Sequence, residues 1–264
     1  MPSTLQIAQL KARLASLSRH ETGGGTGRFT LGMDRVDAYL DPGPCLFCLH
    51  DIHAGTAADA VAANAFALGL ATRATRDRPL VWVFQNLASQ EAGRLHGPGL
   101  YEWGLRPESV LVVRVRDATA MLAAGEEALK SGAVGAVLLS GWGEARAMSL
   151  TASRRLALAA RAGGSTAFVV RAAAAAMPSA AETRWSVRAA LSTGLEAGAP
   201  GRPAFVAALT RSRQGAPPTE WTLEWDRETR AFAEPAPLSG RLVPVPVFGS
   251  AAARAGATGL RRTG

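Results

Sequence analysis

The chain has 264 residues, of which 48% are hydrophobic and 19% are charged, and its formal net charge is +8. This length and composition exclude wholesale disorder and allow one large core. Only two cysteines are present, which excludes a disulfide-rich secreted domain, and no apolar run approaches the ~20 residues of a membrane span. With no apolar segment typical of a signal peptide at the start of the sequence, we expect a cytoplasmic protein.

The positive charge is unevenly distributed. Four arginines and no acidic residue follow Glu234, so the tail carries +4 and residues 1–234 carry the other +4. A strongly basic balance favours acidic partners such as nucleic acid. Because the body of the chain is only mildly basic, direct but weak DNA binding stays an alternative and not the main expectation.

The N-terminal segment predicts a helix that is separate from the rest of the chain. Within residues 3–19, one apolar stripe recurs at helical spacing, formed by Ile7, Leu10, Leu14 and Leu17. The glycine-rich segment 22–27 follows this helix and fits no phosphate-binding pattern, so it indicates a flexible break. We therefore expect residues 1–21 to form an N-terminal helix whose stripe is a candidate partner-binding surface.

The middle of the chain alternates apolar strands with helices, within a core domain expected over residues 28–234. The predicted strands are 45–50, 79–85, 109–115, 133–140 and 165–171, and the predicted helices are 57–74, 117–132 and 149–164. Asp117 is the expected N-cap of the second helix, and Ser149 or Thr151 of the third. Such alternation predicts a parallel sheet covered by helices on both faces.

The pattern changes after residue 171. Segments 183–190, 204–213 and 219–226 alternate in polarity as half-exposed strands do, and the last two flank a turn at 214–218. They predict an antiparallel hairpin added to the parallel core. Their tryptophans, Trp185, Trp221 and Trp225, are expected to form a packing layer. Residues 235–264 are rich in Pro, Ala, Gly and Arg with little periodicity, which predicts a disordered basic tail.

The connection after the first strand is where a phosphate-binding loop is expected, but the required residues are missing. The P-loop pattern GxxxxGK[ST] needs glycines for close backbone approach, a lysine for the phosphates and a hydroxyl for Mg²⁺. In the matching register, Asp51 and Thr56 stand at the two glycines, Ala57 at the lysine and Ala58 at the hydroxyl residue. The chain has only two lysines, Lys11 and Lys130, and no Gly-Lys dipeptide. The pattern predicts a degenerate nucleotide site.

The acidic residue that would hold a metal ion is also missing. The strand at 133–139 is followed by Ser140-Gly-Trp-Gly, with no carboxylate before Glu144. Cys45 and Cys48 are three residues apart on a predicted strand, where an odd spacing places side chains on opposite faces, so we expect buried structural cysteines. His50 and His53 lie in or beside the expected loop without further ligands, so no metal site is predicted.

The order of elements resembles the RecA core, although the residues that would bind and hydrolyse a nucleotide are missing. Residues 104–140 resemble the RecA-type strand, helix and Walker B strand, and residues 181–190 resemble the strand after the second DNA-binding loop. More specifically, residues 148–171, the TRW strand and the hairpin at 209–226 resemble the ImuA family. The resemblance implies a RecA-like α/β fold of P-loop NTPase type, with a parallel sheet, an antiparallel C-terminal hairpin and a degenerate nucleotide site.

ImuA proteins are RecA-related accessory proteins of inducible mutagenesis. The resemblance therefore implies a non-enzymatic role in damage-induced translesion synthesis, without cofactor, metal or catalytic residues. Its implied partners are an ImuB-like inactive Y-family polymerase, an error-prone C-family DNA polymerase complex, and RecA. Arg154 and Arg155, adjacent near a helix start, are further candidate partner-binding residues.

Two alternatives remain open: a RecA-type ATP-dependent DNA-binding protein with an unorthodox site, and a SulA-like cell-division inhibitor. Two departures from RecA argue against a DNA filament. The segment between the strand at 133–139 and the next helix is short, and no basic residue lies between Arg171 and Arg184.

Overall fold

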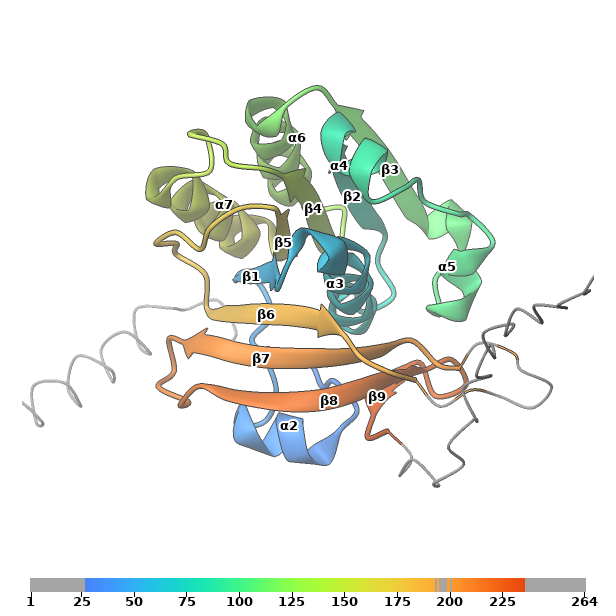
Figure 1. Cartoon of the computed structure of the whole chain (residues 1–264). Helices are drawn as coiled ribbons and strands as arrows, with labels where there is room; N and C mark the ends of the chain where they lie inside the picture. The colour runs from blue at the N-terminus through green and yellow to red at the C-terminus, as the bar shows by residue number, and fades with distance from the viewer. Residues whose placement is uncertain (1–26, 193, 195–198, 200, 236–264) are drawn as a thin grey trace, which may run out of the picture.

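The computed structural model describes residues 27–192, 194, 199 and 201–235 (Figure 1). The predicted N-terminal helix and its stripe of Ile7, Leu10, Leu14 and Leu17 lie outside the described residues, and so does the predicted tail beyond Pro235. Among the helices that are described, none is both long enough and apolar enough to cross a membrane.

A single nine-stranded sheet organises the described chain, with the strand order β3-β2-β4-β5-β1-β6-β7-β8-β9. The strands are β1 (Leu49–Ala54), β2 (Leu80–Gln85), β3 (Val110–Val115), β4 (Ala136–Trp142), β5 (Thr166–Ala172), β6 (Thr183–Ala189), β7 (Ala204–Ser212), β8 (Thr219–Asp226) and β9 (Ala231–Ala233). The first six run parallel to one another, whereas β7, β8 and β9 pair antiparallel. The predicted α/β class, the largely parallel sheet and the C-terminal hairpin are confirmed.

Helices cover both faces of this sheet. The helical elements are α2 (Asp34–Tyr39), η1 (Ala57–Asp59), α3 (Ala60–Ala74), α4 (Asn86–Glu91), α5 (Gly99–Glu102), η2 (Pro107–Ser109), α6 (Ala118–Lys130) and α7 (Leu150–Gly163). α3 packs on one face, and α6 and α7 pack on the other (Figure 1). Both predicted caps are present: the Asp117 carboxylate accepts the Ala120 N–H at 2.9 Å, and the Ser149 hydroxyl accepts the Ala152 N–H.

The larger core lies on the α3 face and extends under the hairpin. It contains Trp185, Trp221 and Trp225, which confirms the predicted tryptophan layer. α3 approaches this layer closely because Gly69 has no side chain: a Cβ there would lie 2.5 Å from the Phe232 ring. The second core fills the space between the sheet and the facing sides of α6 and α7.

The predicted bounds of the first strand were wrong. Cys45 makes only an isolated bridge with Arg28, and Phe47 adopts a left-handed backbone with φ 58°, which interrupts an extended chain. β1 therefore starts at Leu49 and continues to Ala54, so that Asp51 and His53 lie within the strand and not in the loop after it. The segment 183–190 was predicted as part of the antiparallel addition. In the structure its strand, β6, pairs antiparallel with β7 on one side but parallel with β1 on the other.

Candidate functional site

The carboxyl edge of the parallel sheet is the natural place for a site in this architecture. β1 lies between β5 and β6, all three strands run in the same direction, and α3 follows directly after β1. Ligands of open α/β sheets bind outside the carboxyl ends of the strands, next to the N-terminus of a following helix. The residues at this edge therefore show whether a nucleotide would fit at the usual site of such a sheet.

The connection between β1 and α3 is short and already capped by a carboxylate. Only Gly55 and Thr56 separate β1 from η1. Asp59 accepts hydrogen bonds from the Thr56 N–H at 2.9 Å, the Thr56 hydroxyl at 2.7 Å and the Ala189 N–H at 2.9 Å. The Thr56 N–H, the backbone donor of this connection that Asp59 binds, is thus held by a negatively charged side chain and is not free for a phosphate.

The titration of Asp59 agrees with this geometry. Partial burial raises the pKa of its carboxyl, but the hydrogen bonds from Ala189 and Thr56 outweigh burial and lower that pKa below its ordinary value. Asp59 is therefore ionised at neutral pH. Ala57 and Ala58, which stand at the predicted lysine and hydroxyl positions, are exposed and offer no group to a phosphate or a metal ion.

The side chain of Arg188, on β6, lies against Gly55 in this connection. A Cβ on Gly55 would lie 2.5 Å from Cγ of Arg188, so the stem of the arginine rests on the glycine. The Arg188 guanidinium is 3.1 Å from the Glu220 carboxylate on β8, in a half-exposed ion pair. Arg188, whose stem lies against the loop, therefore has a carboxylate partner of its own.

β4 continues to Trp142, past the predicted end of the strand, so Ser140 lies inside the strand near its carboxyl end, where a metal-binding acid would be expected. Neutral hydrogen bonds occupy this position. The Ser140 hydroxyl accepts the Trp82 indole N–H at 2.8 Å and donates to Oδ1 of Asn64 at 2.5 Å. The Asn64 amide in turn donates to the Ala60 carbonyl at 2.8 Å. Ser140 is 1% exposed and Trp82 is buried, whereas Asn64 at the α3 end of this chain of hydrogen bonds is half-buried.

The expectation that Asp51 stands in a phosphate loop was wrong. Asp51 is in the middle of β1 and 4% exposed, and its carboxylate accepts the Ser179 hydroxyl at 2.6 Å and lies 3.2 Å from the Arg184 guanidinium. Burial raises the pKa of the Asp51 carboxyl, but the neighbouring His53, Ser179 and Arg184 together lower it below its ordinary value. Asp51 therefore anchors β6 and the segment before it to β1.

The histidines predicted at the loop are also inside β1. His50 is fully buried between the Thr183 hydroxyl, 2.7 Å from Nδ1, and the Cys45 carbonyl, 2.9 Å from Nε2. Burial lowers the pKa of His50 to about 4, so its ring is neutral at physiological pH. His53 is buried as well, 3.9 Å from the Asp51 carboxylate, and neither of its ring nitrogens has a hydrogen-bond partner in the described chain.

The two cysteines do not alternate on a strand as predicted, because both precede β1. They are half-buried and not fully buried. The Cys45 thiol accepts the Gln214 amide at 2.7 Å, whereas the Cys48 thiol donates to the Cys45 carbonyl at 3.3 Å. Burial raises the pKa of both thiols. Among the residues that the structure describes, no group of three or more His, Cys, Asp and Glu could hold a metal ion.

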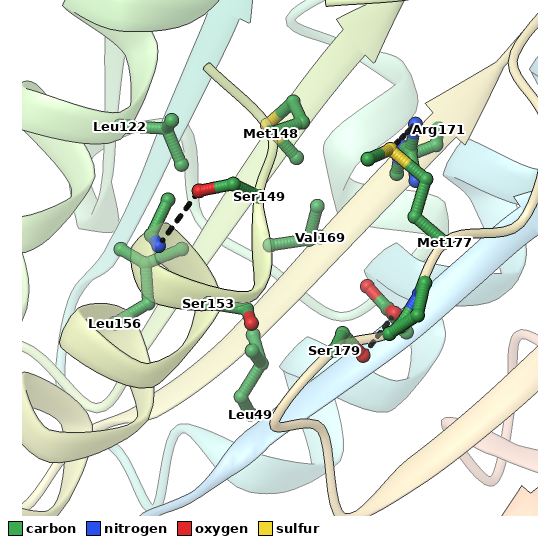
Figure 2. A pocket seen from close by; sticks show the side chains of 13 residues that line it. Leu49, Leu122, Met148, Ser149, Ser153, Leu156, Val169, Arg171, Met177 and Ser179 are labelled. Atoms are coloured by element: carbon green, nitrogen blue, oxygen red, sulfur yellow. Dashed lines mark hydrogen bonds between the residues drawn. The ribbon is translucent and has the colours of Figure 1, made fainter. Parts of the chain in front are cut away.

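A small cavity lies beside Asp51 on the α7 face of the sheet. Figure 2 shows Ser149, which caps α7, and Ser153 of α7 on one side, and Arg171, Met177 and Ser179 on the other. Its volume of about 20 Å³ is enough for one water molecule and too small for a nucleotide. A wider groove of about 260 Å³ runs between α6 and α7.

The candidate residues Arg154 and Arg155 lie on the outer side of α7. Arg155 forms an ion pair with Glu126 of α6, which is 13% exposed, across the groove. Arg154 is exposed and makes no ion pair with the described residues. It lies between two exposed leucines at four-residue spacing, Leu150 at 37% and Leu158 at 65%. Of the two predicted arginines, Arg154 is thus the one available to a partner.

The sequence analysis did not single out three residues that make contacts at this edge of the sheet: Asp59, Asn64 and Arg188. Asp59 had a local signal, because Thr56-Ala-Ala-Asp59 fits a capping box, and the structure contains that box. The other two act through long-range contacts that no local pattern reveals. Comparisons of the chain with models of known protein families and with curated proteins found no match.

Proposed function

We propose that this protein is a RecA-related, non-enzymatic adaptor of the ImuA type, acting in an error-prone translesion polymerase complex. Two features support a relation to the RecA core: the first strand, β1, is central in a parallel sheet and leads directly into a helix, and an antiparallel extension follows β6. The resemblance of residues 148–171 and 209–226 supports the ImuA assignment. The cytoplasm is the compartment that this role requires.

The observation that carries the non-enzymatic part is the carboxylate of Asp59 at the start of α3. A nucleotide with Mg²⁺ would bring negative phosphates to a connection that holds an ionised aspartate, which already binds the Thr56 N–H. At the lysine and hydroxyl positions, Ala57 and Ala58 supply no counter-charge and no metal ligand. Near the carboxyl end of β4, Ser140 is hydrogen-bonded to Trp82 and Asn64. These residues do not fit ATP and Mg²⁺, so no step of the proposed role uses them.

We expect no stabilisation by Mg-ATP and no ATP hydrolysis. A ligand at 100 times its Kd would add about 2.7 kcal/mol to the free energy of unfolding, which would raise the Tm by about 5–10 °C for a domain of this size. Thermal unfolding with and without millimolar Mg-ATP should give Tm values within about 1 °C of each other. Phosphate release in the presence of DNA should equal that of a heat-inactivated control.

A Tm shift of several degrees, or phosphate release above the control, would contradict the adaptor assignment and favour the RecA-type ATP-dependent alternative. Filamentation of cells on overexpression would instead favour the SulA-like alternative.

Partner binding requires a surface, and the outer side of α7 is one candidate. Leu150, Arg154 and Leu158 form one exposed stripe on this helix, which has three arginines and no acidic residue. A stripe of apolar and basic side chains suits a partner segment that is apolar and acidic. The N-terminal stripe, outside the described residues, is the second candidate.

We expect Arg154→Glu with Leu158→Asp to reduce pull-down of an ImuB-like protein or of RecA at least tenfold. Leu10→Asp with Leu14→Asp tests the N-terminal stripe in the same assay. Arg35→Glu is the matched control, because the Arg35 side chain is 77% exposed on α2, away from α7. Circular dichroism should show every variant folded. Undiminished binding by both double variants would exclude both surfaces, and no binding by the wild type would contradict the adaptor role.

A further inference from the structure

A buried arginine near the carboxyl end of β5 has no oxygen atom within hydrogen-bond distance in the described chain. The Arg171 side chain is 6% exposed, and its guanidinium makes one hydrogen bond there, to the Met177 sulfur at 3.5 Å, which is a weak acceptor. The one carboxylate of the described chain within ion-pair range, that of Glu144, is 4.0 Å away and 61% exposed. Buried cations are normally paired and hydrogen-bonded, so Arg171 retains donors that need an acceptor.

Further polar atoms without partners lie around Arg171. His53 of β1 is opposite Arg171 in the pairing of β1 with β5, and neither of its buried ring nitrogens has a hydrogen-bond partner in the described chain. Nε of Arg184, on the other side of β1, has none either. These three nitrogens are among the four buried side-chain atoms without a partner in the part of the chain that the structure describes. Because buried polar groups are normally satisfied, such a concentration indicates a bound water molecule or ion.

Arg171 lines the cavity beside Asp51, whose volume of about 20 Å³ suits one particle of the size of a water molecule (Figure 2). Ser149, which caps the 14-residue helix α7, lines the same cavity. The Ser149 hydroxyl accepts the Ala152 N–H and has no acceptor for its own proton within the described residues. A helix N-terminus carries partial positive charge, so the cavity has a cation and the start of a helix in its lining, and both favour a negative occupant.

The Asp51 carboxylate also lines the cavity, but it does not neutralise Arg171. It lies 3.2 Å from the Arg184 guanidinium and accepts the Ser179 hydroxyl at 2.6 Å, so its charge is balanced by Arg184. The charge of Arg171 is then offset within the described chain by the exposed Glu144 alone, at 4.0 Å. A water molecule would fill the cavity without neutralising this charge, whereas an anion of similar size would do both.

We propose that this cavity binds one chloride ion, held by the Arg171 guanidinium and by the Ser149 hydroxyl at the start of α7. Chloride is a common physiological anion close to a water molecule in size, whereas phosphate and sulfate need more room than about 20 Å³. The ion ties the end of β5 to the start of α7. It uses neither the connection between β1 and α3 nor the outer side of α7, so it does not depend on the proposed adaptor role.

The first test compares thermal unfolding of the full chain in sodium chloride and in sodium gluconate, both at about 0.15 M, the physiological ionic strength. Chloride should raise the Tm by about 3 °C or more, the shift expected when a ligand is near ten times its Kd. Arg171→Met removes the cation and should abolish the difference between the two salts. Arg227→Met is the control, because it removes an exposed arginine paired with Glu102 and should keep the difference. No difference in the wild type, or an unchanged one in Arg171→Met, would overturn the proposal.

Ser149 allows a second test that does not alter the buried arginine. Aspartate and threonine both cap helices, so Ser149→Asp and Ser149→Thr should both leave α7 folded. Ser149→Asp places a carboxylate at the cavity and should remove the response to chloride, whereas Ser149→Thr keeps the hydroxyl and should retain it. If the two variants respond to chloride equally, the ion does not lie at Ser149 and the proposal fails.

Sulfate separates binding in the cavity from the general effect of salts on folding. Sulfate strengthens the burial of apolar surface in proteins generally, so it should raise the Tm of the wild type and of Arg171→Met by the same amount. A larger rise in the wild type would show that the site takes a bigger oxyanion, which contradicts the proposed ligand. Crystals grown in sodium bromide locate the ion directly: we expect an anomalous peak beside Arg171, and its absence there would overturn the proposal.

Discussion

Replacing Asp51 with Asn should lower the free energy of unfolding by about 3–5 kcal/mol, the usual cost of breaking a buried ion pair from one side. The substitution keeps the size of the side chain but removes the charge that faces Arg184, whose side chain is only 14% exposed. Arg184 would then be a buried cation without its carboxylate. Urea unfolding at pH 7 measures the loss.

The control for this substitution is Asp59→Asn, which removes a charge of the same sign at the exposed start of α3. It should cost about 1 kcal/mol, because the asparagine amide nitrogen cannot accept one of the hydrogen bonds that the Asp59 carboxylate receives. The double variant Asp51→Asn with Arg184→Met should recover part of the loss, because the unpaired cation is gone. Equal losses for Asp51→Asn and Asp59→Asn would contradict the assigned role of the buried pair.

The same pair predicts a dependence of stability on pH. The pKa of Asp51 in the folded protein lies below its ordinary value of 3.8, so the folded state binds the proton less tightly than the unfolded state. The stabilisation is therefore fully present above about pH 4 and is lost as the pH falls through the lower, folded pKa. The difference in stability between wild type and Asp51→Asn should shrink over this range, and a constant difference would show that the carboxylate is not the stabilising group.

The sequence predicted a strand accurately where its run of apolar residues was long, and poorly where the run was short or interrupted. β2, β4 and β5 were predicted within three residues at each end, because runs of buried apolar residues between helices identify parallel strands. The start of β1 was misplaced because Leu46 and Phe47 are apolar, although the backbone of Phe47 turns left-handed. β9 was missed because three residues are too few to show alternation.

The candidate site was less predictable than the fold. The absence of a lysine and of a hydroxyl at Ala57 and Ala58 was visible in the sequence, whereas the partner of Asp51 was not. Arg184 is 133 residues away from Asp51, and only the pairing of β1 with β6 brings the two together. Local patterns report which groups a helix or strand contains, and the sheet order decides which of them meet.

Introducing an acid near the carboxyl end of β4, by Ser140→Asp, should destabilise the protein by about 3 kcal/mol or more and should not create a metal site. A carboxylate at this position, where Ser140 is 1% exposed, would keep the Trp82 N–H as a donor but would face the Asn64 carbonyl oxygen, which is an acceptor. Within the described chain, Ser140 has hydrogen bonds to these two side chains and no cation beside it.

Two further variants separate the charge from the lost hydroxyl. Ser140→Ala removes both hydrogen bonds and should cost about 1–3 kcal/mol. Ser131→Asp places the same charge on an exposed residue after α6 and should cost less than about 1 kcal/mol. Thermal unfolding of all three variants with and without Mg²⁺ and ATP gives the comparison.

If Mg²⁺ with ATP raised the Tm of Ser140→Asp by several degrees, the edge of the sheet would retain the geometry of a nucleotide site. The Asp59 carboxylate could then not be the reason why the protein binds no nucleotide. If the ligands leave the Tm unchanged while the order of destabilisation holds, the neutral chain of Trp82, Ser140 and Asn64 is part of the core, and this edge of the sheet serves to hold α3 in place.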